Sequence, residues 1–249
     1  MCTLTIVPLS GGRVRLAFNR DEQRTRAPGH PPTRRRFGTR ETILPIDPIS
    51  GGTWLAVNDA GLALAVLNAN PPDARREYAP RRSRGELIPV LLECTTPAAA
   101  LGELERAASY PDFAPFRLVL VGCGVGADVL WDGRQPMVMS RLVGGTPLLF
   151  TSSGLGDHLV EAVRRELFDD LFAGPAKEWE SAQDAFHRHR WPDRPHLSVN
   201  MDRPDARTVS HAVIEVGPTS AIFAYHPDAP DRPAEREIVH LPFATVGAS

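Results

Sequence analysis

Short apolar runs separated by turn residues recur along the chain and predict a protein rich in β-strands. Two such runs, residues 2–8 and 14–18, flank the pair Gly11-Gly12 and predict a β-hairpin. The polar sequence Asn19-Arg20-Asp21-Glu22 closes the second strand. Because a hairpin brings the start of its first strand to the end of its second, we expect Cys2 to lie beside this cluster.

The same pattern continues to the end of the chain. A second hairpin is predicted over residues 53–57 and 62–67, and its nearly continuous apolar character indicates strands buried on both faces. Further strands are predicted at residues 116–121, 127–131, 137–142, 147–152, 197–201, 208–216, 221–225 and 237–241. Surface loops or turns are predicted at the Arg- and Pro-rich residues 23–40 and at residues 45–48, 68–84 and 122–126.

Helical patterns occur in two pairs. In the first pair, residues 85–93 precede a helix with Thr96 as its N-cap and Pro97 at its first position. In the second pair, residues 157–172 carry Leu159, Val163, Leu167 and Leu171 on one expected buried face, and residues 178–189 follow. Strands followed by two helices, twice over, predict an α+β fold, a four-layer α-β-β-α sandwich, in one domain spanning residues 1–249.

The composition excludes several classes of function. A net charge of −2 over 249 residues gives no reason to expect nucleic acid or an anionic membrane as a partner. No apolar run approaches the ~20 residues of a membrane span. The three cysteines, Cys2, Cys94 and Cys123, are far apart, which argues against a disulfide framework and fits a reducing, cytoplasmic location. We expect no metal site, because His187 and His189 would point apart on a helix.

The position of Cys2 directly after Met1 suggests a particular chemistry. Removal of Met1 would give Cys2 a free α-amine, and the unperturbed pKa values of amine and thiol, about 8 and about 8.5, let one deprotonate the other. Asp21 could orient the amine, Arg20 could hold the thiolate or a substrate carboxylate, and Asn19 could hydrogen-bond locally. This combination is that of an N-terminal-nucleophile (Ntn) hydrolase. The alternatives are a small apolar residue that starts a strand and a set of solvated ion pairs.

Several motifs carry a resemblance to a known family. They are Met1-Cys2, Asn19-Arg20-Asp21-Glu22, Ser50-Gly51-Gly52-Thr53-Trp54, Val57-Asn58, Arg84-Gly85-Glu86-Leu87 and Pro115-Phe116. In order and spacing they resemble the NRDE-motif family, also called the transport and Golgi organisation 2 family. The resemblance implies an Ntn-hydrolase-like fold related to the choloylglycine and penicillin V acylases. In those acylases a Cys after the initiator Met is the nucleophile, and an Asp nineteen positions later contacts its amine, a separation that Cys2 and Asp21 reproduce.

The resemblance implies further site residues. Related acylases stabilise the oxyanion with an Asn on a central strand, but residues 150–154 contain none, so Ser153 is the candidate donor or else part of a plain loop. Arg207 is the best match to an arginine placed near the nucleophile, with a surface arginine as the alternative. For substrate binding the candidates are Glu22, Gly52, Thr53 and Trp54, and for the last three the alternative is a turn followed by a core aromatic.

Three functions follow as hypotheses. The first is an Ntn cysteine hydrolase that acts on an amide-like acyl bond of a small molecule and requires no cofactor. The second is a non-catalytic protein that binds or transports haem or an acyl-thioester lipid in the same cleft, since eukaryotic relatives are associated with haem trafficking and lipid metabolism; a His or Cys2 would then ligate the haem. The third is a scaffold with a structural or interaction role.

Overall fold

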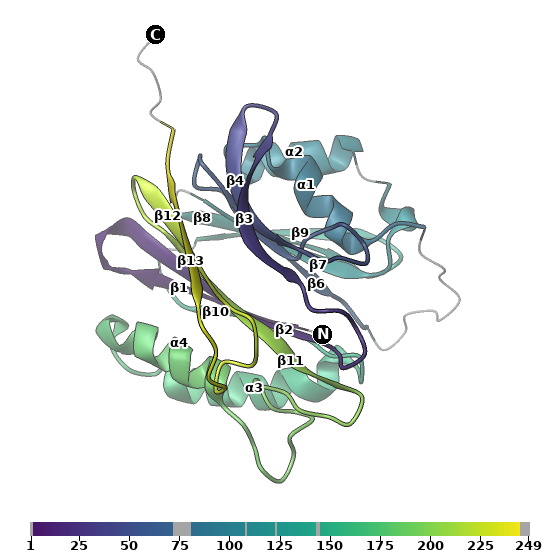
Figure 1. The fold of residues 1–249 in the computed structure, drawn as a ribbon, viewed down its shortest axis with the longest axis vertical. Coiled ribbons are helices and arrows are strands. Elements are labelled where there is room, and N and C mark those ends of the chain that lie inside the picture. The colour runs from purple at the N-terminus through teal and green to yellow at the C-terminus, as the bar shows by residue number, and fades with distance from the viewer. Residues whose placement is uncertain (1, 72–80, 108, 123, 143–144, 245–249) are drawn as a thin grey trace.

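The computed structural model describes residues 2–71, 81–107, 109–122, 124–142 and 145–244. Within them two antiparallel β-sheets stack face to face, and a pair of helices covers the outer face of each sheet (Figure 1). The fold is therefore the α+β, four-layer α-β-β-α sandwich that the sequence predicts. None of the helices in these ranges is long and apolar enough to cross a membrane.

The first sheet holds the N-terminal hairpin at its centre. Its order is β10-β1-β2-β11-β12-β13. The strands are β1 (Cys2–Leu9), β2 (Arg13–Gln23), β10 (Leu148–Ser152), β11 (Ala206–Val216), β12 (Ser220–His226) and β13 (Glu237–Pro242). Gly11 and Gly12 turn the hairpin with φ values of 73° and 72°, a conformation that glycine adopts without steric cost. Cys2 is thereby paired with Arg20 on one side and with Ser152 on the other.

The second sheet is built from the middle of the chain in sequential order, β3 to β9. Its strands are β3 (His30–Phe37), β4 (Arg40–Ile46), β5 (Leu55–Asn58), β6 (Ala63–Asn68), β7 (Phe116–Gly122), β8 (Val125–Trp131) and β9 (Pro136–Leu142). The predicted turn at residues 122–126 shortens to the connection between β7 and β8, and Cys123 lies outside the described residues.

The helices follow the predicted pairing. The first pair, α1 (Leu87–Leu91) and α2 (Pro97–Ala107), packs on the second sheet, and α3 (Asp157–Leu171) and α4 (Trp179–Arg188) pack on the first. The short 3₁₀ turns are η1 (Ser10–Gly12), η2 (Arg84–Glu86), η3 (Tyr110–Asp112) and η4 (Ala176–Glu178). The Thr96 Oγ1 accepts a hydrogen bond from the Ala99 N–H at 3.1 Å, which confirms the predicted N-cap.

Two segments differ from prediction in their backbone structure. Residues 23–40 are not one loop, because β3 and the start of β4 occupy half of them. This strand is largely exposed at the edge of its sheet, so it lacks apolar alternation, and an edge position tolerates Pro31 and Pro32. Conversely, residues 197–201 form no strand; they are an irregular buried segment held by reciprocal bonds of Met201 and Thr208.

The buried face of α3 also differs from prediction. Leu159 is 48% exposed, and the buried positions of the helix are Val160, Arg164 and Phe168. The buried face lies one residue further along the helix than predicted. The prediction missed it because this face contains Arg164, and a search for apolar periodicity treats an arginine as solvent-facing.

The main core lies between the sheets. Leu4, Ile6, Leu16 and Phe18 of the first hairpin are almost fully buried against side chains of the second sheet. Burial of each such side chain stabilises the fold by roughly 1.5–3 kcal/mol. Since strand residues alternate, Thr3 and Thr5 of β1 point the other way, toward α3 and α4.

Candidate active site

Cys2 lies at the wall of a cleft of about 220 Å³ where the two sheets meet. Its side chain is 8% exposed. The cleft is lined from four directions: β1 and the end of β2, the loop after β4, the end of β6, and the η2 turn. The lining residues are Cys2, Arg20, Asp21, Glu22, Arg26, Asp47, Ser50, Gly52, Thr53, Trp54, Val66, Asn68, Ser83, Arg84 and Gly85.

The surroundings of Cys2 keep its thiol protonated. Burial raises the pKa of the Cys2 thiol, and the nearby Asp21 carboxylate acts in the same direction. A hydrogen bond from the Asp21 backbone N–H and the charge of Arg20 oppose this shift but do not overcome it. A thiol in this state needs a base before it can act as a nucleophile.

The backbone nitrogen of Cys2 has a defined partner. It donates a hydrogen bond to the Oγ of Ser152 at 3.0 Å. Ser152 is fully buried at the end of β10, directly opposite Cys2 in the strand register. The sequence suggested the next residue, Ser153, as an oxyanion donor and did not single out Ser152, because the pairing of β10 with β1 cannot be read from either strand alone.

Asp21 is buried below Cys2 at the end of β2. Its Oδ1 accepts a hydrogen bond from the Thr208 hydroxyl at 2.6 Å, across a β-bulge between Thr208 and Ser210 of β11. Burial raises the pKa of the Asp21 carboxyl, while the charge of Arg164 and the Thr208 bond lower it. A bulge can redirect a side chain, and here Thr208 contacts a predicted site residue.

Arg164 supplies the buried positive charge on the helix side of the site. Its guanidinium donates to the Thr3 hydroxyl at 2.8 Å and the Thr151 hydroxyl at 2.7 Å. It also donates to the Leu197 carbonyl at 3.0 Å and the Ser198 carbonyl at 2.7 Å. These bonds tie α3 to the strands that carry Cys2 and Ser152. The sequence signal for Arg164 was its four-residue spacing from Val160 and Phe168.

A salt-bridged group forms the opposite wall of the cleft. Arg20 donates to Asp47 at 2.7 Å, lies 3.4 Å from Glu22, and stacks over the Trp54 ring at 4.3 Å. Arg26 binds Asp47 with two nitrogens, each at 3.0 Å. Although burial acts to raise the pKa of the Asp47 carboxyl, hydrogen bonds from Arg26 and from backbone N–H groups hold it below its usual value.

Two glycines join the loop after β4 to the η2 turn. A Cβ at Gly52 would lie 2.6 Å from the carbonyl carbon of Gly85, and the Thr53 N–H donates to the Gly85 carbonyl at 3.0 Å. The motifs around Gly52 and Gly85 that carried the family resemblance therefore form one wall of the cleft together. This contact places Thr53, Trp54 and Arg84 in the lining.

The structure brings Cys2, Arg20, Asp21, Glu22, Gly52, Thr53 and Trp54 together, but three predicted residues do not line the cleft. Asn19 faces the helix layer: its amide donates to the His187 and Val199 carbonyls, and its Oδ1 accepts from His187 at 3.0 Å and His211 at 2.8 Å. The expected contact of Asn19 is thus a structural one, made between β2, α4 and β11. This network occupies His187, and among the described residues no group of three or more His, Cys, Asp or Glu side chains could hold a metal ion.

Ser153 belongs to the turn before α3. Its backbone N–H donates to Asp157 at 2.7 Å, and its Oγ accepts from the Leu155 N–H at 3.2 Å. It lies one position beyond Ser152, the last residue of β10, so the two serines belong to different elements.

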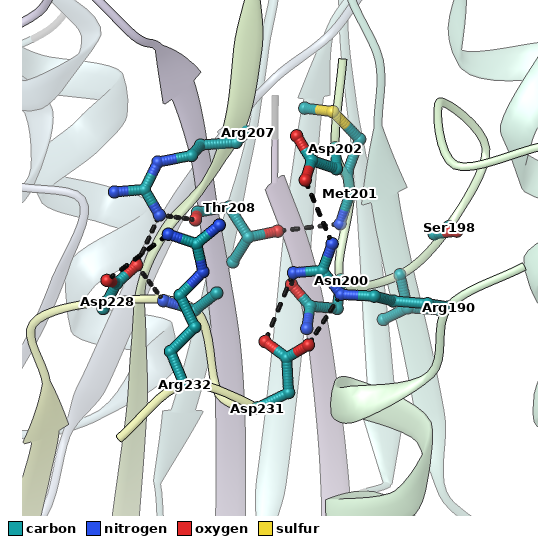
Figure 2. Close-up of polar contacts among 12 residues, drawn as sticks. Arg190, Ser198, Asn200, Met201, Asp202, Arg207, Thr208, Asp228, Asp231 and Arg232 are labelled. Atoms are coloured by element: carbon teal, nitrogen blue, oxygen red, sulfur yellow. Dashed lines mark hydrogen bonds and ion pairs between the residues drawn. The ribbon is translucent and has the colours of Figure 1, made fainter. Parts of the chain in front are cut away.

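Arg207 lies in a separate cluster of charged residues. Figure 2 shows it with Arg232 at Asp228, while Arg190 contacts Asp202 and Asp231. Its neighbour Thr208 reaches Asp21 instead, because successive residues of β11 point to opposite faces. Arg207 therefore has the position of a surface arginine paired with the loop after β12.

The fold is shared with solved structures of two hydrolases. A C2A mutant of the conjugated bile acid hydrolase from Clostridium perfringens matches with a TM-score of 0.54 and 13% identity, over 96% of this chain and 92% of that one. The Caenorhabditis elegans ortholog of N-acylethanolamine-hydrolyzing acid amidase matches with a TM-score of 0.58 and 15% identity, over 96% of this chain and 100% of that one. The chain thus has the fold of the Ntn hydrolases.

Sequence comparison adds the family. The family model of transport and Golgi organisation 2 matches residues 1–140. The chain belongs to the transport and Golgi organisation 2 family, which confirms the resemblance drawn from its motifs. A search of curated protein sequences gave no match.

Proposed function

We propose that this protein is an Ntn cysteine hydrolase that cleaves an amide-like acyl bond, with Cys2 as nucleophile after removal of Met1. The observation that carries the proposal is the position of Cys2. Its thiol lies at the cleft and accepts a hydrogen bond from the Asp21 backbone N–H, while its backbone nitrogen donates a hydrogen bond to Ser152. An α-amine at that nitrogen would belong to the same residue as the thiol and could take the thiol's proton. This base is needed because burial raises the pKa of the thiol.

The reaction would proceed in two acyl transfers. The amine accepts the thiol proton, the Cys2 sulfur bonds to the substrate carbonyl carbon, and collapse of the tetrahedral adduct breaks the C–N bond. The leaving nitrogen takes the proton from the Cys2 ammonium. Water, deprotonated by the same amine, then attacks the thioester, and the acid leaves as the thiol regains its proton.

Asn68 is our candidate for the oxyanion donor. It ends β6, lines the cleft with Cys2, and within the described part of the chain its carboxamide makes no hydrogen bond to another residue. A free N–H donor beside the nucleophile is what a developing oxyanion requires. Asn68 would replace the asparagine that residues 150–154 lack.

The size of the cleft favours a small substrate. Its volume of about 220 Å³ is below the roughly 300–1,000 Å³ of pockets that enclose drug-sized ligands. Asn68 also lines a second cavity of about 360 Å³, beside β10 and α3, into which a longer acyl chain could extend. Haem or an acyl-thioester lipid in the same cleft, bound without turnover, is the alternative proposal, and a cytoplasmic location stays a prediction.

The first test is the intact mass of the purified protein. Loss of Met1 supports the amine as base. Full retention of Met1 would contradict it, because the Cys2 nitrogen would then be an amide, and haem and acyl-thioester binding assays would become the experiments of choice.

The second test is turnover of a panel of small N-acyl amides. Cys2→Ala should abolish turnover, Asp21→Asn and Asn68→Ala should lower it, and Cys94→Ser should leave it intact because Cys94 lies outside the cleft. Retained turnover in Cys2→Ala, with Cys94→Ser as the matched thiol control, would overturn the proposal.

A further inference from the structure

The charges of the Cys2 cleft do not all cancel in pairs. Two of its arginines, Arg20 and Arg26, share Asp47 and Glu22. The third arginine, Arg84, forms no ion pair among the described residues. Its Nη1 donates to the Pro115 carbonyl at 3.1 Å.

Arg84 retains most of its hydrogen-bonding capacity. A guanidinium carries five N–H donors in a planar fork, and it stays charged in proteins. Burial lowers the pKa of Arg84, whereas attraction to Cys2 and Glu22 raises it. A partly buried cation without an ion-paired carboxylate is costly, so an anion that entered the cleft would gain a charge-assisted bond from the free N–H groups of Arg84.

The side chain is also held in place before any ligand binds. Ser83 and Glu86 form a reciprocal capping box around the η2 turn, and the Gly85 carbonyl is fixed by Thr53. The Pro115 bond anchors one nitrogen of the guanidinium. Such preorganisation reduces the entropy lost on binding.

We propose that Arg84 is a carboxylate-binding residue, and that the substrates of the Cys2 site carry a carboxylate close to the scissile acyl bond. The second half of this statement rests on the proposed hydrolase function. The first half does not, because the anion site needs only the cleft, the cation and the neighbouring thiol.

Alkylation of Cys2 tests the anion site without any turnover. Iodoacetate and iodoacetamide both convert the Cys2 thiolate to a thioether with release of iodide, and they differ in that iodoacetate carries a carboxylate. The ratio of their rate constants at Cys2, read from the N-terminal peptide by mass spectrometry, reports attraction of a carboxylate. We expect this ratio in the native protein to exceed that of the urea-unfolded chain about tenfold, the effect of one charge-assisted bond of ~1.4 kcal/mol.

Variants assign the effect to one arginine. Arg84→Gln should return the ratio to the unfolded value, Arg84→Lys should keep part of it, and Arg81→Gln should not change it, because Arg81 is an exposed arginine on the same segment that does not line the cleft. An equal ratio in native and unfolded wild-type protein overturns the proposal, and that comparison requires no variant to fold. An unchanged ratio in folded Arg84→Gln does the same.

Turnover separates this proposal from the hydrolase proposal. A carboxylate substrate should be preferred over its carboxamide analogue about tenfold in kcat/KM, and Arg84→Gln should remove the preference mainly through KM. If no amide is cleaved but the alkylation ratio is high, the hydrolase proposal fails and the anion site stands. If neutral amides are cleaved and the ratio of alkylation rate constants is the same in native and unfolded protein, the anion-site proposal fails and the hydrolase proposal stands.

Discussion

The Oγ of Ser152 accepts a hydrogen bond from the Cys2 nitrogen at 3.0 Å. The two residues are 150 positions apart and face each other only because β10 pairs with β1 in one register. In the hydrolase mechanism that we propose, this nitrogen is the base, so its partner would decide where the lone pair points. Ser152 is therefore the residue of β10 that we expect to affect catalysis.

The first prediction compares adjacent serines. Ser152→Ala should lower kcat about tenfold, the effect of one lost hydrogen bond of ~1.4 kcal/mol, with little change in KM. Ser153→Ala should have a smaller effect on kcat, because its Oγ accepts from the Leu155 N–H in the turn before α3. Single-turnover kinetics on one amide substrate would check this, and a larger loss of kcat in Ser153→Ala would contradict it.

The second prediction concerns the wall of the cleft. Gly52→Ala places a Cβ 2.6 Å from the Gly85 carbonyl carbon and 2.7 Å from its oxygen, so two backbone segments must separate. We expect a loss of about 2 kcal/mol in the free energy of unfolding. The ratio of the iodoacetate to the iodoacetamide rate constant at Cys2 should also decrease, because Arg84 moves with its neighbour Gly85.

Gly102→Ala is the matched control for Gly52→Ala. Gly102 is within α2, and a Cβ there would have no neighbour within 4 Å. The same substitution should therefore stabilise the protein by up to about 1 kcal/mol. Urea unfolding of both variants measures the two effects, and equal effects would show that the glycine contact does not matter.

Local patterns predict much of this site. The hairpin of residues 2–18 brings Cys2 beside Arg20 through a tight turn, which sequence alone identifies, and the register Cys2↔Arg20 follows from that turn. Most strands and the four helices are likewise predicted because their apolar periodicity is short-range. Periodicity does not predict β3, because an exposed edge strand has no buried face to reveal it.

Long-range register is what sequence reasoning lacked. A slip of one residue would exchange Ser152 for Ser153 opposite Cys2, and nothing in the local sequence of residues 148–153 distinguishes the two serines. Arg164 also depends on long-range pairing, because the four groups to which it donates hydrogen bonds lie in β1, in β10 and in the segment before β11. Its burial depends on partners that no local window contains.

The third prediction tests this buried arginine. Arg164→Met keeps the volume of the stem but leaves two carbonyls and two hydroxyls without their donor, so we expect a loss on the order of 3 kcal/mol in the free energy of unfolding. Arg165→Met is the control, because within the described residues Arg165 donates one hydrogen bond, to the Leu149 carbonyl at 3.2 Å, and otherwise lies over the Phe168 ring. Its loss should stay below about 1 kcal/mol. Equal urea midpoints for the two variants would contradict a structural role of Arg164.

The last prediction concerns the pH dependence of stability. Burial lowers the pKa of His211 from 6.5 to about 3, and burial also lowers the pKa of His187. Both rings donate through Nδ1 to the same Asn19 oxygen. The His187 Nε2 accepts from the Thr5 hydroxyl, so His187 is neutral, and the lowered pKa of His211 keeps that ring neutral at pH 7. The unfolded chain binds protons below pH ~6.5 that the folded chain does not, so stability is complete above that pH and decreases as the pH decreases toward about 3.

His211→Asn removes this proton uptake while retaining an N–H that can donate to Asn19. The wild-type protein should lose about 2 kcal/mol more than His211→Asn between pH 7 and pH 5, as one group with a shift of this size requires. Urea unfolding at the two pH values measures the difference, and the comparison cancels the contribution of Asp21, which both proteins share. Parallel pH profiles would mean that His211 is protonated in the folded state or titrates normally, and the assigned hydrogen-bond network would then be wrong.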